Sequence, residues 1–411
     1  MLIEFSIENY RSIKDKVTFS MIASKDLSLE DNLITSVLKS DNLLRSAVIY
    51  GANASGKSNI LMAFYFLKAL VLNSHNHQKG QGIKYEPFKL DKACLQIPTR
   101  FQIIFIQNEI KYAYTIAFNG IKVLEESLYW YKNNRRALLF ERINTEFKFT
   151  RDKTIQNFIA ERTLENTLYL SKATQENYQE VFPVFDWFKN QLQFIGPYQP
   201  IGSERPTIAF IEKESKNKEL ILKALAEADL ALEDIEVNLR LLEKIPESLP
   251  PEIKSFINIA KTLSLEEINI KTSHKGVVFD YFTEESEGTK RLFSLIGLWL
   301  DALENGRILV IDELEVKLHH KLNLFLINLF HNKIQNKTNA QLIFTTHNTN
   351  LLDQTIFRRD QIWFTEKNEE KGSTELYSLI EFSPRKDKDI ERGYLAGRYG
   401  ALPFIKENGF G

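Results

Sequence analysis

A phosphate-binding loop is the strongest chemical signal in the sequence. Residues 51–58 read GANASGKS and fit the pattern G-x-x-x-x-G-K-[ST]. Glycines let successive backbone N–H groups close around phosphate oxygens, and the following helix points its positive end at the same anion. Lys57 would supply a charge for the β- and γ-phosphates of ATP, and the Ser58 hydroxyl would be a ligand of Mg²⁺. The residues expected to contact the nucleotide are Asn53, Ala54, Ser55, Gly56, Lys57 and Ser58.

Two carboxylates follow a second apolar run. The segment 307–313 reads RILVIDE, so Asp312 and Glu313 come directly after a predicted buried strand, at the strand edge where α/β sheets bind ligands. We expect Asp312 to hold Mg²⁺, directly or through water, and Glu313 to accept a proton from the attacking water. An acidic pair after a strand is more often a solvated loop or a helix cap, but the phosphate loop makes the catalytic interpretation the better one.

Two further segments fit the same chemistry. His347 follows the apolar run 341–345 and is expected at the same edge as the acids, where it would contact the γ-phosphate and help to position water. The segment 286–291, SEGTKR, precedes a predicted helix, so the Ser286 hydroxyl and nearby N–H groups could form another anion cradle. The alternatives are a structural histidine and an ordinary helix N-cap.

The elements that must position these residues indicate an α/β fold. Strand-like runs alternate with helical ones around the motifs, which implies a parallel central sheet covered on both sides. Period-2 alternation over 101–118, with a turn at Asn108 and Glu109, predicts an antiparallel subdomain. Residues 154–265 are charged, Leu-rich and interrupted by prolines, which favours a helical insertion. The predicted division is 1–150 for the first part of the head with the antiparallel subdomain, 151–265 for the mainly helical insertion and 266–411 for the rest of the head.

Composition bounds the setting. In 411 residues, 53 Lys and Arg balance 54 Asp and Glu, so no net field draws the chain to nucleic acid or to an anionic membrane. The single cysteine, Cys94, excludes an internal disulfide framework, and we find neither a signal-peptide core nor a stretch of about 18 apolar residues. We expect a cytoplasmic protein with no membrane partner.

The order of phosphate loop, 286–291 segment, acidic strand and histidine resembles the ABC-ATPase superfamily. The segments FSIENYRSI, EPFKLD, DELEVKLHH and YLAGRYGALPFI narrow this resemblance to the RloA-like AAA-type ATPases of prokaryotic defence loci, relatives of the OLD and RecF groups. The likeness implies that Ser286 and Gly288 belong to a diverged signature that grips the nucleotide of a second head. It also places Arg11 and Ser12 near nucleotide and requires a magnesium-sensing glutamine, for which Gln78, Gln81, Gln96 and Gln102 compete.

The resemblance implies a nucleotide-driven switch. Two ATP molecules sandwiched between two heads would form a homodimer or a higher homo-oligomer, whose closure controls a separate effector protein in antiphage defence. The alternatives are a nucleotide-gated scaffold with negligible turnover and a DNA-binding repair-type ATPase. A fused nuclease is disfavoured because 64 residues follow His347 and their acids lie in a charged, loop-like stretch. The basic residues that could line a nucleic-acid groove are Arg135, Arg136, Lys213, Lys216, Lys218, Arg385, Lys386 and Lys388. The sequence identifies neither the trigger nor the effector.

Overall fold

The computed structural model describes residues 1–35, 37, 41–133, 135–196, 204–230, 232–241, 266–382 and 389–402. Contacts divide the chain into two units. Unit 1 contains residues 1–197, 302–316 and 323–411, and unit 2 contains residues 198–301 and 317–322. Each unit is described by itself.

A six-stranded sheet forms the centre of unit 1. Its order is β11-β15-β16-β5-β17-β18, and every neighbouring pair is parallel except β17 with β18. The strands are β5 (Ser46–Gly51), β11 (Leu192–Ile195), β15 (Ile308–Ile311), β16 (Gln341–Thr345), β17 (Ile362–Lys367) and β18 (Thr374–Ser378). All residues of β5, β15 and β16 are buried, as expected for parallel strands with both faces covered. The predicted α/β class with a parallel central sheet is therefore confirmed.

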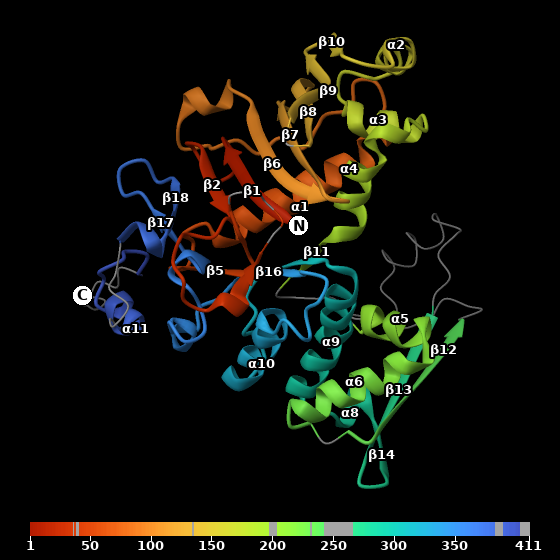
Figure 1. The fold of residues 1–411 in the computed structure, drawn as a ribbon, viewed down its shortest axis with the longest axis vertical. Coiled ribbons are helices and arrows are strands. Elements are labelled where there is room, and N and C mark those ends of the chain that lie inside the picture. The colour runs from red at the N-terminus through yellow and green to blue at the C-terminus, as the bar shows by residue number, and fades with distance from the viewer. Residues whose placement is uncertain are drawn as a thin grey trace, which may run out of the picture. The chain divides into compact units, whose positions relative to one another are not determined.

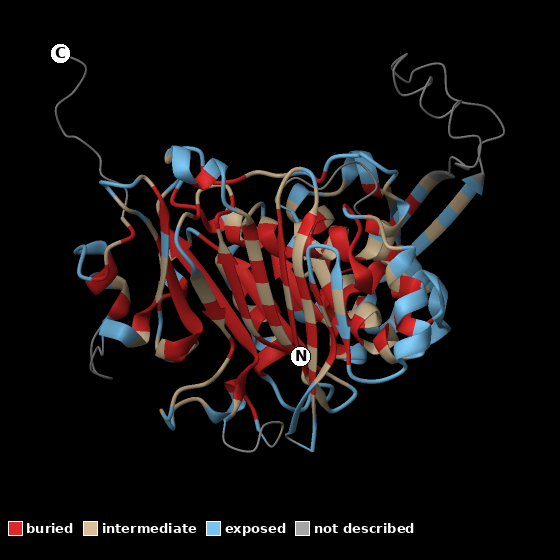
Figure 2. Cartoon of the chain, turned by 90° about the horizontal axis from the view of Figure 1, so that it is seen from above, coloured by how far each residue is buried: buried red, intermediate tan, exposed pale blue. Residues whose placement is uncertain are grey.

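A second, antiparallel sheet of seven strands completes the predicted subdomain. Its order is β10-β9-β8-β7-β6-β1-β2. The strands are β1 (Leu2–Glu8), β2 (Val17–Ser20), β6 (Thr99–Gln107), β7 (Ile110–Phe118), β8 (Val123–Lys132), β9 (Arg135–Ile143) and β10 (Glu146–Phe149). Buried and partly exposed residues alternate along β6, as Figure 2 shows for strands of unit 1. The predicted turn between β6 and β7 is present, since Asn108 and Glu109 have φ angles of 49° and 61°, which a tight hairpin requires.

Helix α1 (Lys57–Asn73) joins the two sheets into one core (Figure 1). Phe64 packs on Phe5 of β1 with ring centroids 3.9 Å apart, while Tyr65 meets Phe194 of β11 edge-on at 5.5 Å. Because neighbouring residues of α1 contact different sheets, the helix must be apolar nearly all round, which explains its sequence SNILMAFYFLKALVLN. The position of this helix therefore depends on contacts with both sheets.

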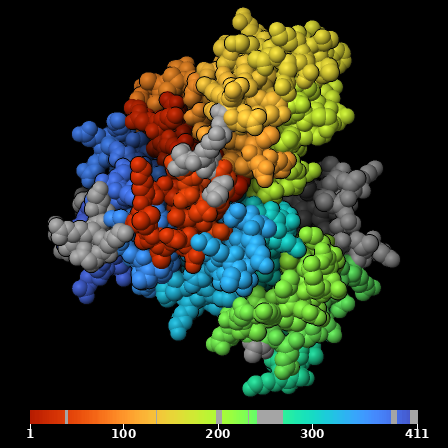
Figure 3. All heavy atoms as spheres, viewed as in Figure 1, coloured from red at the N-terminus to blue at the C-terminus, as the bar shows by residue number. Residues whose placement is uncertain are grey.

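The remaining elements of unit 1 cover these sheets. They include the small pair β3 (Leu33–Ile34) and β4 (Leu43–Leu44), and the helices α2 (Lys153–Glu161), α3 (Tyr169–Gln175), α4 (Phe182–Asp186), α10 (His320–His331) and α11 (Ile390–Leu395). The first residues of α10 belong to unit 2. Segments of unit 1 that are distant in sequence lie side by side, as the neighbouring red and blue atoms in Figure 3 show. Gln341 of β16 accepts from Leu2 N–H and donates to Leu44 O. Among the described residues, no helix has both the length and the apolar character needed to cross a bilayer.

Unit 2 begins later in the chain than the predicted helical insertion, 151–265. The segment 151–197 belongs to unit 1, where α2 to α4 pack and β11 pairs with β15 in the central sheet. Unit 2 contains a three-stranded antiparallel sheet, β12 (Asp234–Leu241), β13 (Glu266–His274) and β14 (Val277–Asp280). Its helices are α5 (Arg205–Lys213), α6 (Ser215–Glu227), α8 (Tyr281–Glu284) and most of α9 (Glu287–Asn305). Three of the prolines that interrupt the predicted insertion, Pro246, Pro250 and Pro251, lie outside the described residues.

The buried His331 at the end of α10 makes stability depend on pH. Burial, assisted by the charge of Arg45, lowers the pKa of this ring to about 3, and its Nε2 lies 2.7 Å from Ser46 Oγ. Below pH ~6.5 the unfolded chain takes up a proton that the folded chain refuses, so the free energy of unfolding should fall by about 1.4 kcal/mol per pH unit from this group. Urea unfolding between pH 5 and 7 gives the free energy of unfolding at each pH. Its change with pH should be smaller for His331→Gln than for the wild type, and unchanged for His319→Gln, because His319 is exposed. Equal slopes for all three proteins would contradict the assignment.

Candidate functional site

The phosphate loop lies between the C-terminal end of β5 and the start of α1 (Figure 1). Gly56 caps the helix with φ 110°, and Ala54 has φ 63°. Such left-handed residues turn consecutive N–H groups to one side, as an anion cradle requires. Asn53, Ala54 and Ser58 are exposed, whereas Ser55 and Lys57 are buried. The loop can therefore receive phosphate oxygens at its open side.

Two threonines hold the loop from the neighbouring hairpin. The hydroxyl of Thr365 on β17 lies 2.6 Å from Ser55 Oγ, and the hydroxyl of Thr374 on β18 donates to Ser55 O at 2.8 Å. The Thr374 hydroxyl also lies 2.7 Å from Ser12 Oγ, which accepts from Asn59 Nδ2 of α1 at 2.7 Å. These hydroxyls fix the loop before any ligand arrives, which lowers the entropic cost of binding. Sequence reasoning missed both threonines.

Replacing Gly56 by alanine should break this arrangement. A Cβ at this position would meet Thr374 Oγ1 at 2.1 Å, and the residue would retain a positive φ. We expect Gly56→Ala to weaken ATP binding by about tenfold or more, because the clash and the backbone strain, at ~1–3 kcal/mol for the latter, displace the N–H groups. Titration with a fluorescent ATP analogue measures the change. Gly120→Ala is the matched control, since its Cβ would lie at an ordinary 3.5 Å from Tyr85 Cβ, and wild-type affinity in both variants would contradict the prediction.

The acidic pair lies at the end of β15, two strands from β5. Thr345, the last residue of β16, donates its hydroxyl to Asp312 Oδ1 at 2.7 Å and accepts from Glu313 N–H at 2.8 Å. One hydroxyl thus holds the Asp312 side chain and the Glu313 backbone. Glu313 has φ 55°, a costly conformation for a residue with a Cβ and one that clusters at functional sites.

The electrostatics of Lys57 show that the predicted residues meet. Its ammonium donates to the Gly51 and Ala52 carbonyls at 2.7 and 3.2 Å. Burial lowers the pKa of Lys57, while the negative charges of Asp312 and Glu313 oppose that shift. The strands β5, β16 and β15 are parallel neighbours, so the phosphate loop after β5 and the acidic pair after β15 lie at the same edge of the sheet.

His347 lies at the same edge, after β16. Its backbone N–H donates to Glu315 Oε1 at 2.6 Å, and the residue is exposed. Removal of part of the ring from water, and then the charge of Lys57, lower the pKa of His347, whereas Glu315 and Glu313 raise it. The imidazole is therefore biased towards its neutral form. Glu315 was also missed, although it lies two residues after Glu313 in the same acidic motif.

Ser58 and Asp312 line one cavity of about 260 Å³, bounded by Leu61, Phe194 and Val310. A hydroxyl and a carboxylate are oxygen ligands of the kind that Mg²⁺ takes alongside phosphate oxygens and water. The donor set therefore fits a magnesium ion. Within the described residues no cluster of three or more His, Cys, Asp or Glu side chains could hold a metal by itself.

The N-terminal turn flanks the loop on another side. Arg11 pairs with Glu86 at 3.0 Å, and its NH1 reaches Asn59 Oδ1 of α1 at 3.4 Å. A cavity of about 360 Å³ is lined by Arg11, Ser12, Ala54 and Glu86. The segments FSIENYRSI and EPFKLD, which are distant in sequence, thus meet beside the phosphate loop.

The candidate signature lies in unit 2. Ser286 Oγ accepts from Thr289 N–H at 3.1 Å at the start of α9, as a helix N-cap does. Gly288 has Lys317 O 3.6 Å from the position of a Cβ and no positive φ. Within unit 2 the segment is therefore a capped helix start with an exposed serine.

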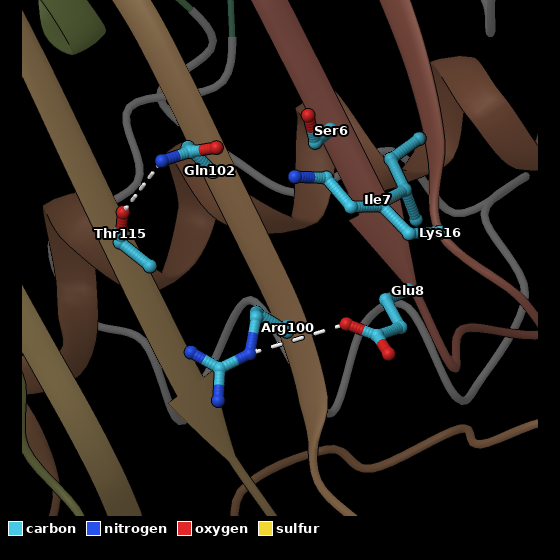
Figure 4. A pocket seen from close by; sticks show the side chains of 7 residues that line it. All are labelled: Ser6, Ile7, Glu8, Lys16, Arg100, Gln102 and Thr115. Carbon is cyan, nitrogen blue, oxygen red and sulfur yellow. Dashed lines mark hydrogen bonds and ion pairs between the residues drawn. The ribbon is translucent and has the colours of Figure 1, made fainter.

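The four glutamines proposed as magnesium sensors do not gather at the phosphate loop. Gln102 lies on the antiparallel sheet, in a cavity of about 170 Å³, where its Nε2 donates to Thr115 Oγ1 at 3.4 Å (Figure 4). Gln81 accepts from Gln78 N–H at 2.9 Å, and Gln96 is exposed after a short 3-10 turn.

The basic residues that the structure describes are divided between the two units. Arg135 and Arg136 belong to unit 1, where Arg136 stacks 3.8 Å over the ring of Tyr129. In unit 2, Lys216 pairs with Glu214 and Lys218 with Asp234. The predicted residues Arg385, Lys386 and Lys388 lie outside the described part of the chain.

Known structures with a similar arrangement are heads of SMC proteins. The SMC head domain from Thermotoga maritima is 15% identical, with 92% of this chain and 98% of that chain covered and a TM-score of 0.41. An SmcHead bound to the C-winged helix domain of ScpA is 17% identical, with 93% and 99% covered and a TM-score of 0.42. An Smc head with an extended coiled coil, derived from Pyrococcus furiosus, is 15% identical, with 93% and 97% covered and a TM-score of 0.39. No curated protein matches the chain.

A protein-family model identifies the chain more directly. The model described as "AAA domain, putative AbiEii toxin, Type IV TA system" matches residues 46–353. This range begins with β5, includes the phosphate loop and the acidic strand, and ends after His347, so it covers about three quarters of the chain. The chain belongs to this family of P-loop AAA domains.

Proposed function

We propose that the protein binds ATP with Mg²⁺ and hydrolyses it to ADP and phosphate. The proposal is supported by the sheet order, because Lys57, Asp312, Glu313 and His347 follow the C-terminal ends of three parallel neighbouring strands, β5, β15 and β16. Binding alone would need the loop and its lysine. A carboxylate and a neutral-biased imidazole at the same place add what hydrolysis requires, a proton acceptor and a group that orients water.

Each residue of this edge has a chemical task in the proposal. Lys57 neutralises the β- and γ-phosphates, and Ser58 with Asp312 holds Mg²⁺, which shields phosphate charge when bound. Glu313 takes the proton of the attacking water, and the Thr345 hydroxyl holds the Asp312 carboxylate and the backbone N–H of Glu313. His347 hydrogen-bonds water or the γ-phosphate.

Self-association is the second part of the proposal. The exposed start of α9, with Ser286 and Gly288, would contact the γ-phosphate held by a second copy of the chain. Two nucleotides would then close two heads, and the closure would control a separate effector. The RloA-like sequence segments and the toxin–antitoxin wording of the family description favour a role in antiphage defence.

Phosphate release and molecular mass test the two parts separately. The wild-type chain with Mg²⁺ and ATP should release phosphate, and release should stop when Mg²⁺ is chelated. Light scattering should show a larger particle with a slowly hydrolysed ATP analogue than with ADP, and Ser286→Arg should abolish that increase. Phosphate release without any change in mass would leave the ATPase intact and reject the dimer. A mass increase without turnover would instead favour the nucleotide-gated scaffold.

A further inference from the structure

The C-terminal segment 389–402 contacts three elements of the proposed site. We call it the C-terminal clasp. It contains α11 and the described part of the YLAGRYGALPFI segment, to which the proposed hydrolysis assigns no task. Figure 1 shows α11 beside the β17–β18 side of unit 1. The inference below rests on the proposed function, but its test does not depend on turnover.

Aromatic rings of the clasp stack on β17, and one of them also contacts β5, the strand that leads into the phosphate loop. The ring of Tyr394 stacks on Phe364 of β17 at 5.5 Å and 13°, and it lies 6.0 Å from the ring of Tyr50. Tyr50 is the residue before Gly51. Tyr399 stacks on Phe364 at 6.1 Å and 16°. The clasp is therefore attached through aromatic contacts to β17 and to Tyr50 of β5, the two strands beside the phosphate loop.

A separate contact reaches the loop of His347. Thr349 Oγ1 donates to Glu391 Oε1 in the first turn of α11 at 2.7 Å. The Tyr50 hydroxyl donates to Asn348 O at 3.2 Å. His347 itself is exposed. The bonds made by Asn348 and Thr349 restrain the backbone that follows it.

The other end of the clasp lies beside the phosphate loop. Ala401 N–H donates to Glu366 Oε1 at 3.1 Å, and the Tyr377 hydroxyl lies 3.0 Å from Glu366 Oε2. Gly400 has φ 65°, and a Cβ there would meet Glu366 Oε2 at 2.6 Å. A cavity of about 820 Å³ is lined by Ala401 and Leu402 together with Asn53 and Ala54 of the loop.

We propose that the C-terminal clasp is a positioning element that fixes His347 relative to the phosphate loop. Its aromatic rings hold the strand of Tyr50, its Glu391 carboxylate holds the histidine loop, and its 400–401 turn borders the cavity of Asn53. If α11 only covered the edge of the core, its aromatic contacts would be enough. It would not need a hydrogen bond between Glu391 and Thr349, which lies in the polar loop after His347. The Glu391–Thr349 bond is thus the part of the clasp that a positioning role requires.

Hydrogen exchange of the nucleotide-free protein tests this role directly. Glu391→Ala removes the acceptor, Thr349→Val removes the donor, and Glu391→Gln keeps an acceptor oxygen. Arg392→Ala is the matched control in the same turn, because its side chain is 88% exposed. The peptide that covers residues 346–352 should exchange about fivefold faster in Glu391→Ala and in Thr349→Val, at the wild-type rate in Arg392→Ala, and near it in Glu391→Gln. The double variant should exchange no faster than either single one.

Steady-state kinetics give the second measurement. We expect Glu391→Ala to lower kcat about threefold to tenfold with KM for ATP unchanged, since a loosened histidine affects the reacting geometry and not the phosphate loop. Unchanged exchange in 346–352, or equal acceleration by Arg392→Ala, would overturn the proposal. If the wild type showed no phosphate release that depends on Lys57, the proposed hydrolysis would fail, whereas the exchange experiment would still decide the clasp.

Discussion

Lys57→Ala should abolish measurable ATP binding, with a loss of affinity of about 100-fold or more. The Lys57 ammonium is buried and counters the negative charges of Asp312, Glu313 and Glu315. Without it, these carboxylates would repel a triphosphate at short range in a medium where charges are poorly screened. Isothermal titration with ATP and Mg²⁺ measures the loss directly.

The control for this substitution is Lys153→Ala. Lys153 is the first residue of α2, as Lys57 is the first residue of α1. Lys153 is exposed and is not part of the phosphate loop. It should bind ATP as the wild type does. Circular dichroism should show both variants folded, because alanine is well accommodated in the first turn of a helix. Wild-type affinity in a folded Lys57→Ala protein would remove the phosphate loop from the proposed site.

Glu313→Gln should separate binding from chemistry. The amide can adopt the same backbone conformation and keep the N–H bond to Thr345, but it cannot accept a proton from water. Turnover should fall by about 10²–10⁴-fold, the usual contribution of a general base, while ATP affinity is retained. Phosphate release in single turnover measures the first effect, and light scattering with ATP should show a long-lived dimer.

Glu315→Gln is the matched control for loss of charge alone. It removes a negative charge from the same edge but keeps an oxygen that can accept from His347 N–H, as Glu315 Oε1 does. Turnover within a few fold of the wild type is expected. If both glutamine variants lost turnover equally, the effect would be one of local charge, and Glu313 would have no special role. If neither lost turnover, another base would have to be sought.

Contiguous motifs could be predicted from the sequence, whereas contacts made by the sheet order could not. The phosphate loop and the acidic strand each carry their pattern in a few adjacent residues, and their flanking strands follow from apolar runs. The same holds for the β6–β7 hairpin, where an alternating pattern and two turn residues are adjacent. These parts of the fold were predicted correctly because each signal is local.

Thr345, Thr365 and Thr374 gave no such signal. A single threonine near a strand end is common. Thr365 and Thr374 reach the phosphate loop, and Thr345 reaches the acidic pair, only because of the order of the strands in the sheet. β11 was missed for a related reason: its four residues, LQFI, follow a helical stretch and are too few to show a period. The expected insertion therefore began too early in the chain.

The hydroxyls that hold the phosphate loop come from residues made long after it. Gly51–Ser58 leaves the ribosome early, but both neighbours of β5 in the sheet, β16 and β17, follow roughly three hundred positions later, and Thr374 later still. A nascent chain that ends before β17 lacks both threonine partners of Ser55, and one that ends before β18 lacks Thr374. Nucleotide capture should thus be one of the last properties that this protein acquires during synthesis.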